Sequence, residues 1–182
     1  MFNDKRGKRI IILAHCILNQ NTKLDRLVTC YPGAITEIAE LCIKSGAGIV
    51  QMPCPELLLM GIDRQCKSGT HPSIESEKDR VSLKMNDAEG KKFCESLAEN
   101  MILQIEEYQK NDFKVLGIVG VNKSPTCGVE TTWSDGQKRK GRGVFLDILS
   151  THLNNKKIKI PIIGIKTEEP EKALEAVSKL FA

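Results

Sequence analysis

Three cysteines are spaced along the chain so that one fold could bring them to a single metal site. Cys16, Cys54 and Cys127 each follow, directly or closely, a short apolar run that is typical of a buried strand. The runs span residues 8–15, 48–52 and 114–121. Parallel strands bring their carboxyl ends to one edge of a sheet, where open α/β proteins bind their ligands. If these strands are parallel, their topology alone gathers three thiols.

Thiolates are ligands for zinc, Cu(I) and iron–sulfur clusters. Structural zinc usually takes four ligands, often in closely spaced pairs, whereas these three cysteines are isolated from one another. Three cysteines on a four-iron cluster leave one iron without a protein ligand, which is the open position that a Lewis-acid catalyst needs. The spacing therefore favours a [4Fe-4S] cluster. His15 could add a fourth ligand, but strand alternation would turn its side chain away from Cys16.

The remaining cysteines have a simpler interpretation. The chain has seven cysteines, an odd number, and no C-x-x-C pair, so a disulfide framework is not expected. Cys42 and Cys94 lie on apolar helical stripes and are predicted to be core residues. The same interpretation is favoured for Cys30 and Cys66.

Polar residues beside the cysteines could move protons or bind a substrate. Glu56 is a candidate proton shuttle, although a carboxylate there could equally begin a helix. The hydroxyl of Ser124 could donate to a substrate, or Ser124 could simply form a turn before Pro125. Asn122 and Lys123 could bind a polar substrate, or lie exposed at the surface.

Strands and helices alternate along the chain. Helices are predicted at 32–44, 88–109, 143–153 and 169–180, with a fourth strand at 160–165. This alternation predicts a single α/β domain over residues 1–182, with a parallel Rossmann- or flavodoxin-like sheet of about four strands flanked by helices. Residues 57–88 fit no element clearly, and a long irregular connection of this kind is typically a functional lid or a mobile segment.

The amino-acid composition argues against nucleic acids and membranes as binding partners. The chain has 182 residues, a formal net charge of +4 and only 4% aromatic residues, so it offers no stacking platform for nucleic-acid bases. No apolar run is long enough to span a membrane, and the charged N-terminal residues do not resemble a secretory signal. We therefore expect a cytoplasmic protein whose partner is a small molecule. The oligomeric state does not follow from the sequence.

At the three cysteines the sequence resembles the thiouracil desulfidase family, also catalogued as DUF523. That family carries motifs similar to S-A-C-L-L-G, C-P-E and K-x-S-P-S-C-G. The corresponding stretches here are residues 14–18, 54–56 and 123–128, and their order and spacing match over about residues 10–150. Each motif is short, but three in order, all containing cysteine, are fairly specific.

The resemblance implies a [4Fe-4S] cluster on Cys16, Cys54 and Cys127. It also implies that the thiocarbonyl sulfur of a substrate binds the open iron, while groups matching Glu56 and Ser124 assist a water molecule. The overall reaction is non-redox, and it converts a thioamide and water into an amide and hydrogen sulfide.

Two segments depart from the family pattern. The family often carries C-R-Y-D-G after its first motif, whereas residues 21–25 here lack that cysteine. A P-R-x-P segment after C-P-E is represented only by Asp63 and Arg64. The sequence therefore indicates a related, divergent branch with a different pocket.

Three functions remain open, and each predicts a different site. A desulfidase acting on a small thiolated compound predicts a concave pocket with Glu56 pointing into it. A non-catalytic [4Fe-4S] protein that binds sulfur or senses redox state predicts an exposed cluster. A zinc or thiol protein predicts a fourth ligand, such as His15 or Cys30, close to the three cysteines.

Overall fold

The fold comes from a computed structural model that describes residues 2, 4–66 and 72–182. Within them the strands are β1 (Arg9–Ala14), β2 (Gly48–Met52), β3 (Lys114–Val121), β4 (Thr131–Ser134), β5 (Gln137–Lys140) and β6 (Ile162–Ile165). The α-helices are α1 (His15–Leu18), α2 (Thr36–Lys44), α3 (Pro55–Met60), α4 (Ile74–Asn86), α5 (Ala88–Lys110), α6 (Val144–Asn155) and α7 (Pro170–Ser178). Short 3₁₀ turns lie at η1 (Gln20–Thr22) and η2 (Lys179–Phe181).

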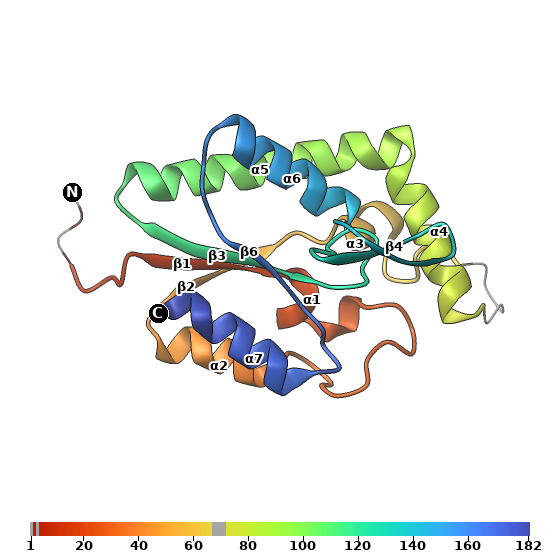
Figure 1. The fold of residues 1–182 in the computed structure, drawn as a ribbon, viewed down its shortest axis with the longest axis horizontal. Helices are drawn as coiled ribbons and strands as arrows, with labels where there is room; N and C mark the ends of the chain where they lie inside the picture. Colours follow the sequence, from red (N-terminus) through yellow and green to blue (C-terminus); the bar gives the residue numbers. More distant parts are fainter. Residues whose placement is uncertain (1, 3, 67–71) are drawn as a thin grey trace.

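Four parallel strands form the main sheet, in the order β2-β1-β3-β6 (Figure 1). β1 is buried almost throughout, as expected for a central parallel strand that is covered on both faces. Its Leu13 lies opposite Gln51 of β2 and Val119 of β3, so these three strands end near the same level. The predicted α/β fold, with a four-stranded parallel sheet flanked by helices, is confirmed.

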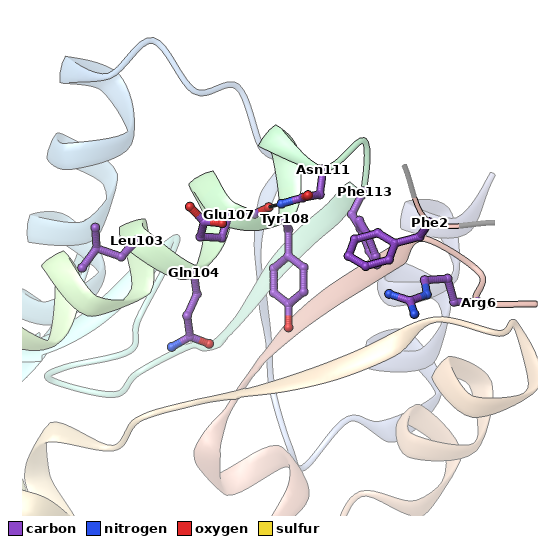
Figure 2. Close-up of a pocket in the computed structure, with 8 residues that line it drawn as sticks. All are labelled: Phe2, Arg6, Leu103, Gln104, Glu107, Tyr108, Asn111 and Phe113. Carbon is purple, nitrogen blue, oxygen red and sulfur yellow. Dashed lines mark hydrogen bonds between the residues drawn. The ribbon is translucent and has the colours of Figure 1, made fainter. Parts of the chain in front are cut away.

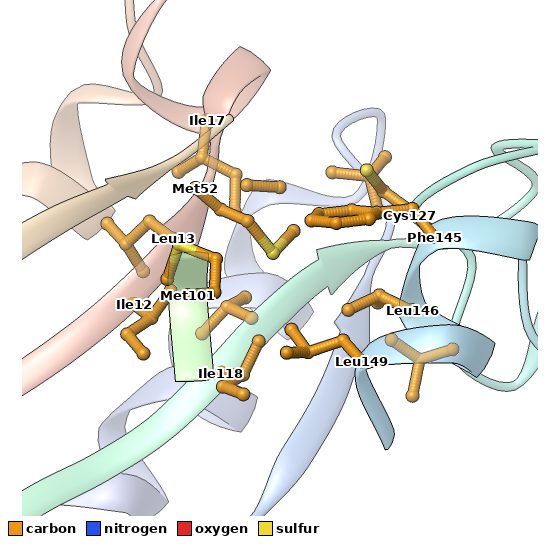
Figure 3. Packing of buried hydrophobic residues seen from close by; sticks show 14 of the residues in the cluster. Ile12, Leu13, Ile17, Met52, Met101, Ile118, Cys127, Phe145, Leu146 and Leu149 are labelled. Atoms are coloured by element: carbon orange, nitrogen blue, oxygen red, sulfur yellow. The ribbon is translucent and has the colours of Figure 1, made fainter. Parts of the chain in front are cut away.

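Helices cover both faces of the sheet. α5 and α6 pack together on one face, and α2 and α7 pack together on the other (Figure 1). Figure 3 shows the core beneath α6, where apolar side chains from several elements meet: Ile12, Leu13, Met101, Ile118, Leu146 and Leu149. This packing fixes the strand ends that carry the cysteines.

Most of the described part of segment 57–88 is helical, so the prediction of an irregular connection there is wrong. α3 continues into the segment, and α4 begins after Ser73, whose hydroxyl accepts a hydrogen bond from the first turn. Asp87 separates α4 from α5, because its carboxylate caps α5 by accepting from the Gly90 N–H at 2.7 Å. Residues 67–71 lie outside the described residues.

Two other boundaries differ from the predictions. α2 begins at Thr36, later than expected, because the N–H of Ile35 donates to the carbonyl of Ile17 at 2.8 Å and ties this stretch to α1. The predicted loop at 122–137 contains part of an antiparallel hairpin, β4-β5. Gly136, with φ 72°, makes the backbone turn that joins its strands.

Cys42 and Cys94 are fully buried on α2 and α5, as predicted. Cys30 is exposed, so the core prediction for it is wrong. Burial raises the pKa of Cys42 to about 11 and that of Cys94 to about 12. Above the ordinary thiol pKa of 9.0, an unfolded chain releases these protons while the folded chain retains them. We therefore expect the free energy of unfolding to be unaffected by these thiols below pH 9.0, and to fall as the pH rises from there towards the shifted values.

Urea unfolding of the metal-free protein at a series of alkaline pH values measures this effect. A Cys42→Ala/Cys94→Ala variant is the matched control. It should be less stable overall but lose less of its free energy of unfolding for each pH increment. Equal slopes for the two proteins would contradict the assignment.

Candidate metal centre

Cys16, Cys54 and Cys127 lie at the carboxyl ends of three neighbouring strands. Cys16 is in α1 directly after β1, Cys54 lies between β2 and α3, and Cys127 is in the loop after β3. All three line one cavity of about 80 Å³. Cys127 is buried, and the other two thiols are half-buried. The structure thus brings together the cysteines that the sequence singled out.

Figure 3 shows Cys127 among the apolar core side chains, beside Phe145. One side of the cavity is therefore continuous with the core. Its polar lining comes from His15, Glu56, Arg64, Ser124 and three lysines, Lys23, Lys78 and Lys123.

His15 lines this cavity too, and the strand alternation that predicted its side chain to turn away from Cys16 ends before it. The prediction assumed that β1 continued through His15, whereas α1 begins there and ends the strand alternation. The His15 Nε2 atom is buried and has no hydrogen-bond partner among the described residues. An unsatisfied buried polar atom costs about 1–3 kcal/mol. Burial also lowers the pKa of His15.

The start of α3 positions Cys54 and Glu56. Cys54 is the N-cap residue, Pro55 occupies the first turn, and Glu56 follows where a carboxylate interacts favourably with the helix dipole. The Glu56 side chain is only 11% exposed and lines the cavity. Glu56 is therefore a helix-start carboxylate that also lies in the cavity, and its role as a proton shuttle stays a prediction.

A hydrogen-bonded turn positions Cys127. The hydroxyl oxygen of Ser124 accepts from the N–H groups of Thr126 at 3.2 Å and Cys127 at 3.0 Å. The carbonyl of Pro125 accepts from the N–H of Val144 in the first turn of α6, at 3.0 Å. The loop that carries Cys127 is thereby held by hydrogen bonds within the loop and by one to α6, which packs in the core.

A chain of hydroxyl groups connects this loop to Glu56. The hydroxyl of Thr126 donates to Glu56 Oε1 at 2.6 Å, and it lies 3.2 Å from the hydroxyl oxygen of Ser124. Because Thr126 has a single hydroxyl proton, which it gives to the carboxylate, Ser124 must be the donor in the second bond. Thr126, only 1% exposed, is a site residue that the sequence reasoning missed.

Arg64 is a buried cation beside Glu56. Its side chain is 1% exposed, and its Nε atom lies 3.5 Å from Glu56 Oε2. The guanidinium donates to the carbonyls of Gly61 at 2.6 Å and Thr22 at 2.5 Å. Its hydrogen bonds join the end of α3 to the segment after α1.

We expect Arg64→Met to lower the free energy of unfolding by about 3–5 kcal/mol, because it leaves Glu56 as a buried charge without its partner. Urea unfolding of the metal-free protein measures the loss. Arg139→Met is the matched control, since Arg139 pairs with Asp135 at the surface, and it should change stability by at most about 0.5 kcal/mol. Similar losses in the two variants would contradict this role for Arg64.

The three thiols in the cavity all resist ionisation. Burial raises the pKa of Cys16 to about 11 and that of Cys54 to about 12, and it raises the pKa of Cys127 well above its ordinary value. The negative charges of Cys54 and Cys16 also raise the pKa of Cys127, and that of Cys16 raises the pKa of Cys54. The charge of Lys23 partly opposes this effect at Cys16. Three thiolates in this space therefore need a positively charged partner.

Lysines surround the open side of the cavity and a groove that adjoins it. Lys123 forms an ion pair with Glu168 at 2.6 Å, and Lys23 donates to the hydroxyl of Thr167 at 2.9 Å. Lys78 lies over the ring of Trp133. Lys123 lines the cavity while its amine pairs with Glu168, and its role in binding a polar substrate stays a prediction.

Asn122 does not line this cavity. Its side-chain oxygen accepts from the backbone N–H groups of Val129, Glu130 and Thr131, at 3.1–3.3 Å, and closes the loop that carries Cys127. The structure therefore gives Asn122 a role in loop geometry, and the substrate-binding role stays a prediction without a contact in this cavity.

A larger cavity of about 560 Å³ lies elsewhere, between α5 and the N-terminal residues (Figure 2). Its lining is mainly apolar, with Tyr108 and Phe113 at its centre and Phe2 packed edge-on against Phe113. It contains no thiol and no paired acid and base. The cysteine cavity is much smaller, but it is the one that gathers groups able to do chemistry.

The described part of the chain has neither a site for a single metal ion nor a membrane-spanning helix. Among residues 2, 4–66 and 72–182, no three His, Cys, Asp or Glu side chains converge in a way that would hold a single metal ion. None of the helices in this part of the chain combines the length and apolarity needed to cross a bilayer.

One known protein is clearly similar to the chain. Over 142 residues it is 34% identical to the uncharacterized protein MJ0003 of Methanocaldococcus jannaschii, and the match covers 78% of this chain and 76% of that protein. No family model matches the chain. No solved structure matches it significantly.

Proposed function

The chain belongs to the same protein family as MJ0003 of Methanocaldococcus jannaschii, and we propose that it is an iron–sulfur-dependent desulfidase. Its substrate in this proposal is a small thiolated compound, such as a thiouracil-like thioamide, from which it removes sulfur by hydrolysis. The protein would form a divergent branch related to the thiouracil desulfidases. The observation that carries the proposal is a buried carboxylate in the same cavity as three isolated thiols.

The donor set fits a [4Fe-4S] cluster. Cys16, Cys54 and Cys127 come from three different strand ends, and a cluster takes each thiolate on a different iron. A cationic group in the cavity also removes the electrostatic cost of three neighbouring thiolates. When bound, the cluster supplies an iron that lacks a cysteine ligand and can attract a soft thiocarbonyl sulfur.

Glu56 is the base in this proposal. Thr126 donates to one carboxylate oxygen and Arg64 lies 3.5 Å from the other, so each oxygen keeps a lone pair that could accept a proton from a water molecule. The water oxygen bonds to the thiocarbonyl carbon, and the carbon–sulfur bond then breaks. The sulfur leaves as hydrogen sulfide with the two protons of the water, so no electrons are gained or lost.

Burial of the site supports a desulfidase over a redox sensor or a sulfur carrier. A sensing or carrier cluster is expected at an exposed surface, where partners can reach it. Here Cys127 is 7% exposed and Glu56 faces the same cavity.

The test is hydrolysis by protein purified without oxygen and reconstituted with iron and sulfide. Incubated with 2-thiouracil, 4-thiouracil and simple thioamides, it should release sulfide and the oxygen-containing product in equal amounts, and ¹⁸O from labelled water should enter the product. Cys30→Ser is the matched cysteine control, because Cys30 is exposed and does not line the cavity. It should retain activity that Cys127→Ser loses. Iron-loaded protein that releases no sulfide from any of these compounds would contradict the proposal.

A further inference from the structure

The backbone places His15 firmly at the edge of the cysteine cavity. Its carbonyl accepts hydrogen bonds from the N–H of Asn19 at 3.0 Å and from the side chain of Gln51 in β2 at 3.2 Å. The first bond belongs to α1 and the second crosses to the neighbouring strand. His15 is therefore held at the junction of β1, α1 and β2, and it lines the cavity together with Cys16.

The ring nitrogen of His15 lacks the partner that a buried nitrogen ordinarily has. Its Nε2 atom is buried without a hydrogen bond, although Glu56, Ser124 and three lysines line the same cavity. Those polar groups are directed elsewhere: Glu56 towards Thr126 and Arg64, and Lys123 towards Glu168. Nearly all buried polar atoms in proteins are satisfied, so an unpaired nitrogen beside three thiols indicates a missing partner at this site.

A metal is the partner that best fits these surroundings. Neutral imidazole has one nitrogen lone pair available and is the commonest protein ligand to transition metals, including iron. The three cysteines of the proposed cluster leave one iron without a protein ligand, and the Nε2 atom of His15, which lines the same cavity, has no hydrogen-bond partner among the described residues. Resting on the proposed function, we infer that His15 Nε2 is a fourth, exchangeable protein ligand of the cluster.

This arrangement gives the site a closed form and an open form. His15 would hold the iron that has no cysteine ligand and would protect it from loss while no substrate is present. A thiocarbonyl sulfur is softer than imidazole, so a substrate would displace His15 from this iron without any transfer of electrons. The ring of His15 then remains in the cavity next to the substrate.

Nitrogen hyperfine spectroscopy tests the inference directly. The protein is reconstituted without oxygen, reduced with dithionite, and examined by pulsed electron paramagnetic resonance for nitrogen coupled to the cluster. We expect a coupling in the wild type that changes on ¹⁵N-histidine labelling and disappears in His15→Ala. His152→Ala is the matched control, because His152 pairs with Glu95 away from the cavity, and it should retain the coupling. Excess 2-thiouracil should remove the coupling from the wild type.

The outcomes separate this inference from the proposed function. A reduced cluster without histidine nitrogen coupling in the wild type would overturn the role of His15 and leave the desulfidase proposal intact. Protein that binds no iron, or binds zinc in its place, would overturn both. Because ¹⁵N labelling uses the unmodified chain, the test holds even if His15→Ala does not fold. Where that variant folds, it should also lose iron several-fold faster than the wild type after exposure to air.

Discussion

Cys16→Ser, Cys54→Ser and Cys127→Ser are each expected to abolish cluster assembly. Wild-type protein reconstituted without oxygen should contain about four irons and as many sulfides, with broad visible absorption, whereas each variant should retain almost none. Serine is a harder and far less acidic ligand than cysteine. No other cysteine lines the cavity, so none of the described cysteines can replace the lost thiol.

Iron and acid-labile sulfide determination, together with the visible spectrum, measures this loss. Cys30→Ser and Cys94→Ser are suitable controls, because neither residue lines the cavity, and both should bind iron like the wild type. Circular dichroism checks that each variant is folded. A full cluster in any of the three cavity variants would show that the corresponding cysteine is not a ligand.

Glu56→Gln is expected to lower the rate of thioamide hydrolysis by about 10²–10⁴-fold, which is the usual contribution of a general base. Glutamine has nearly the same size and can still accept from Thr126, but it cannot take a proton from water. The cluster should be retained, since Glu56 is not one of its proposed ligands. Single-turnover sulfide release by iron-matched samples measures the effect on the chemical step.

Two substitutions at Thr126 test the hydroxyl chain that leads to Glu56. Thr126→Val removes the donor with little change in volume and should slow hydrolysis, though less than Glu56→Gln does. Thr126→Ser restores a hydroxyl and should recover most of the rate. As a control, Glu95→Gln changes a carboxylate that pairs with His152 away from the cavity and should have no effect. Unaltered hydrolysis by Glu56→Gln would show that another group activates the water.

The ionisation of the site thiols affects how the cluster is loaded. Because the three pKa values are raised, a metal-free protein at neutral pH carries neutral thiols, and cluster assembly must release their protons. Reconstitution should therefore become more complete as the pH rises towards 9.0, within the range where the fold is stable. Iron content against pH measures this, and an unchanged yield would contradict the shifted pKa values.

The sequence by itself determined the layers of the fold and the position of the three thiols. Short β-branched runs alternate with amphipathic helices, and that pattern has few solutions other than a parallel sheet with right-handed crossovers. Once the strands are parallel, Cys16, Cys54 and Cys127 must share an edge, because each follows the end of its strand. This inference depends only on local periodicity and a general rule of topology, which is why it did not need the coordinates.

The tertiary structure alone decided which side chains face the cysteines. Thr126 and Arg64 lie beside Glu56 only because a loop and a turn from distant parts of the chain meet there, and no periodicity encodes such meetings. The hydroxyl next to Cys127 in the sequence was the one available sign of Thr126. The prediction for His15 assumed strand alternation, whereas the change from strand to helix occurs at that residue and ends the alternation.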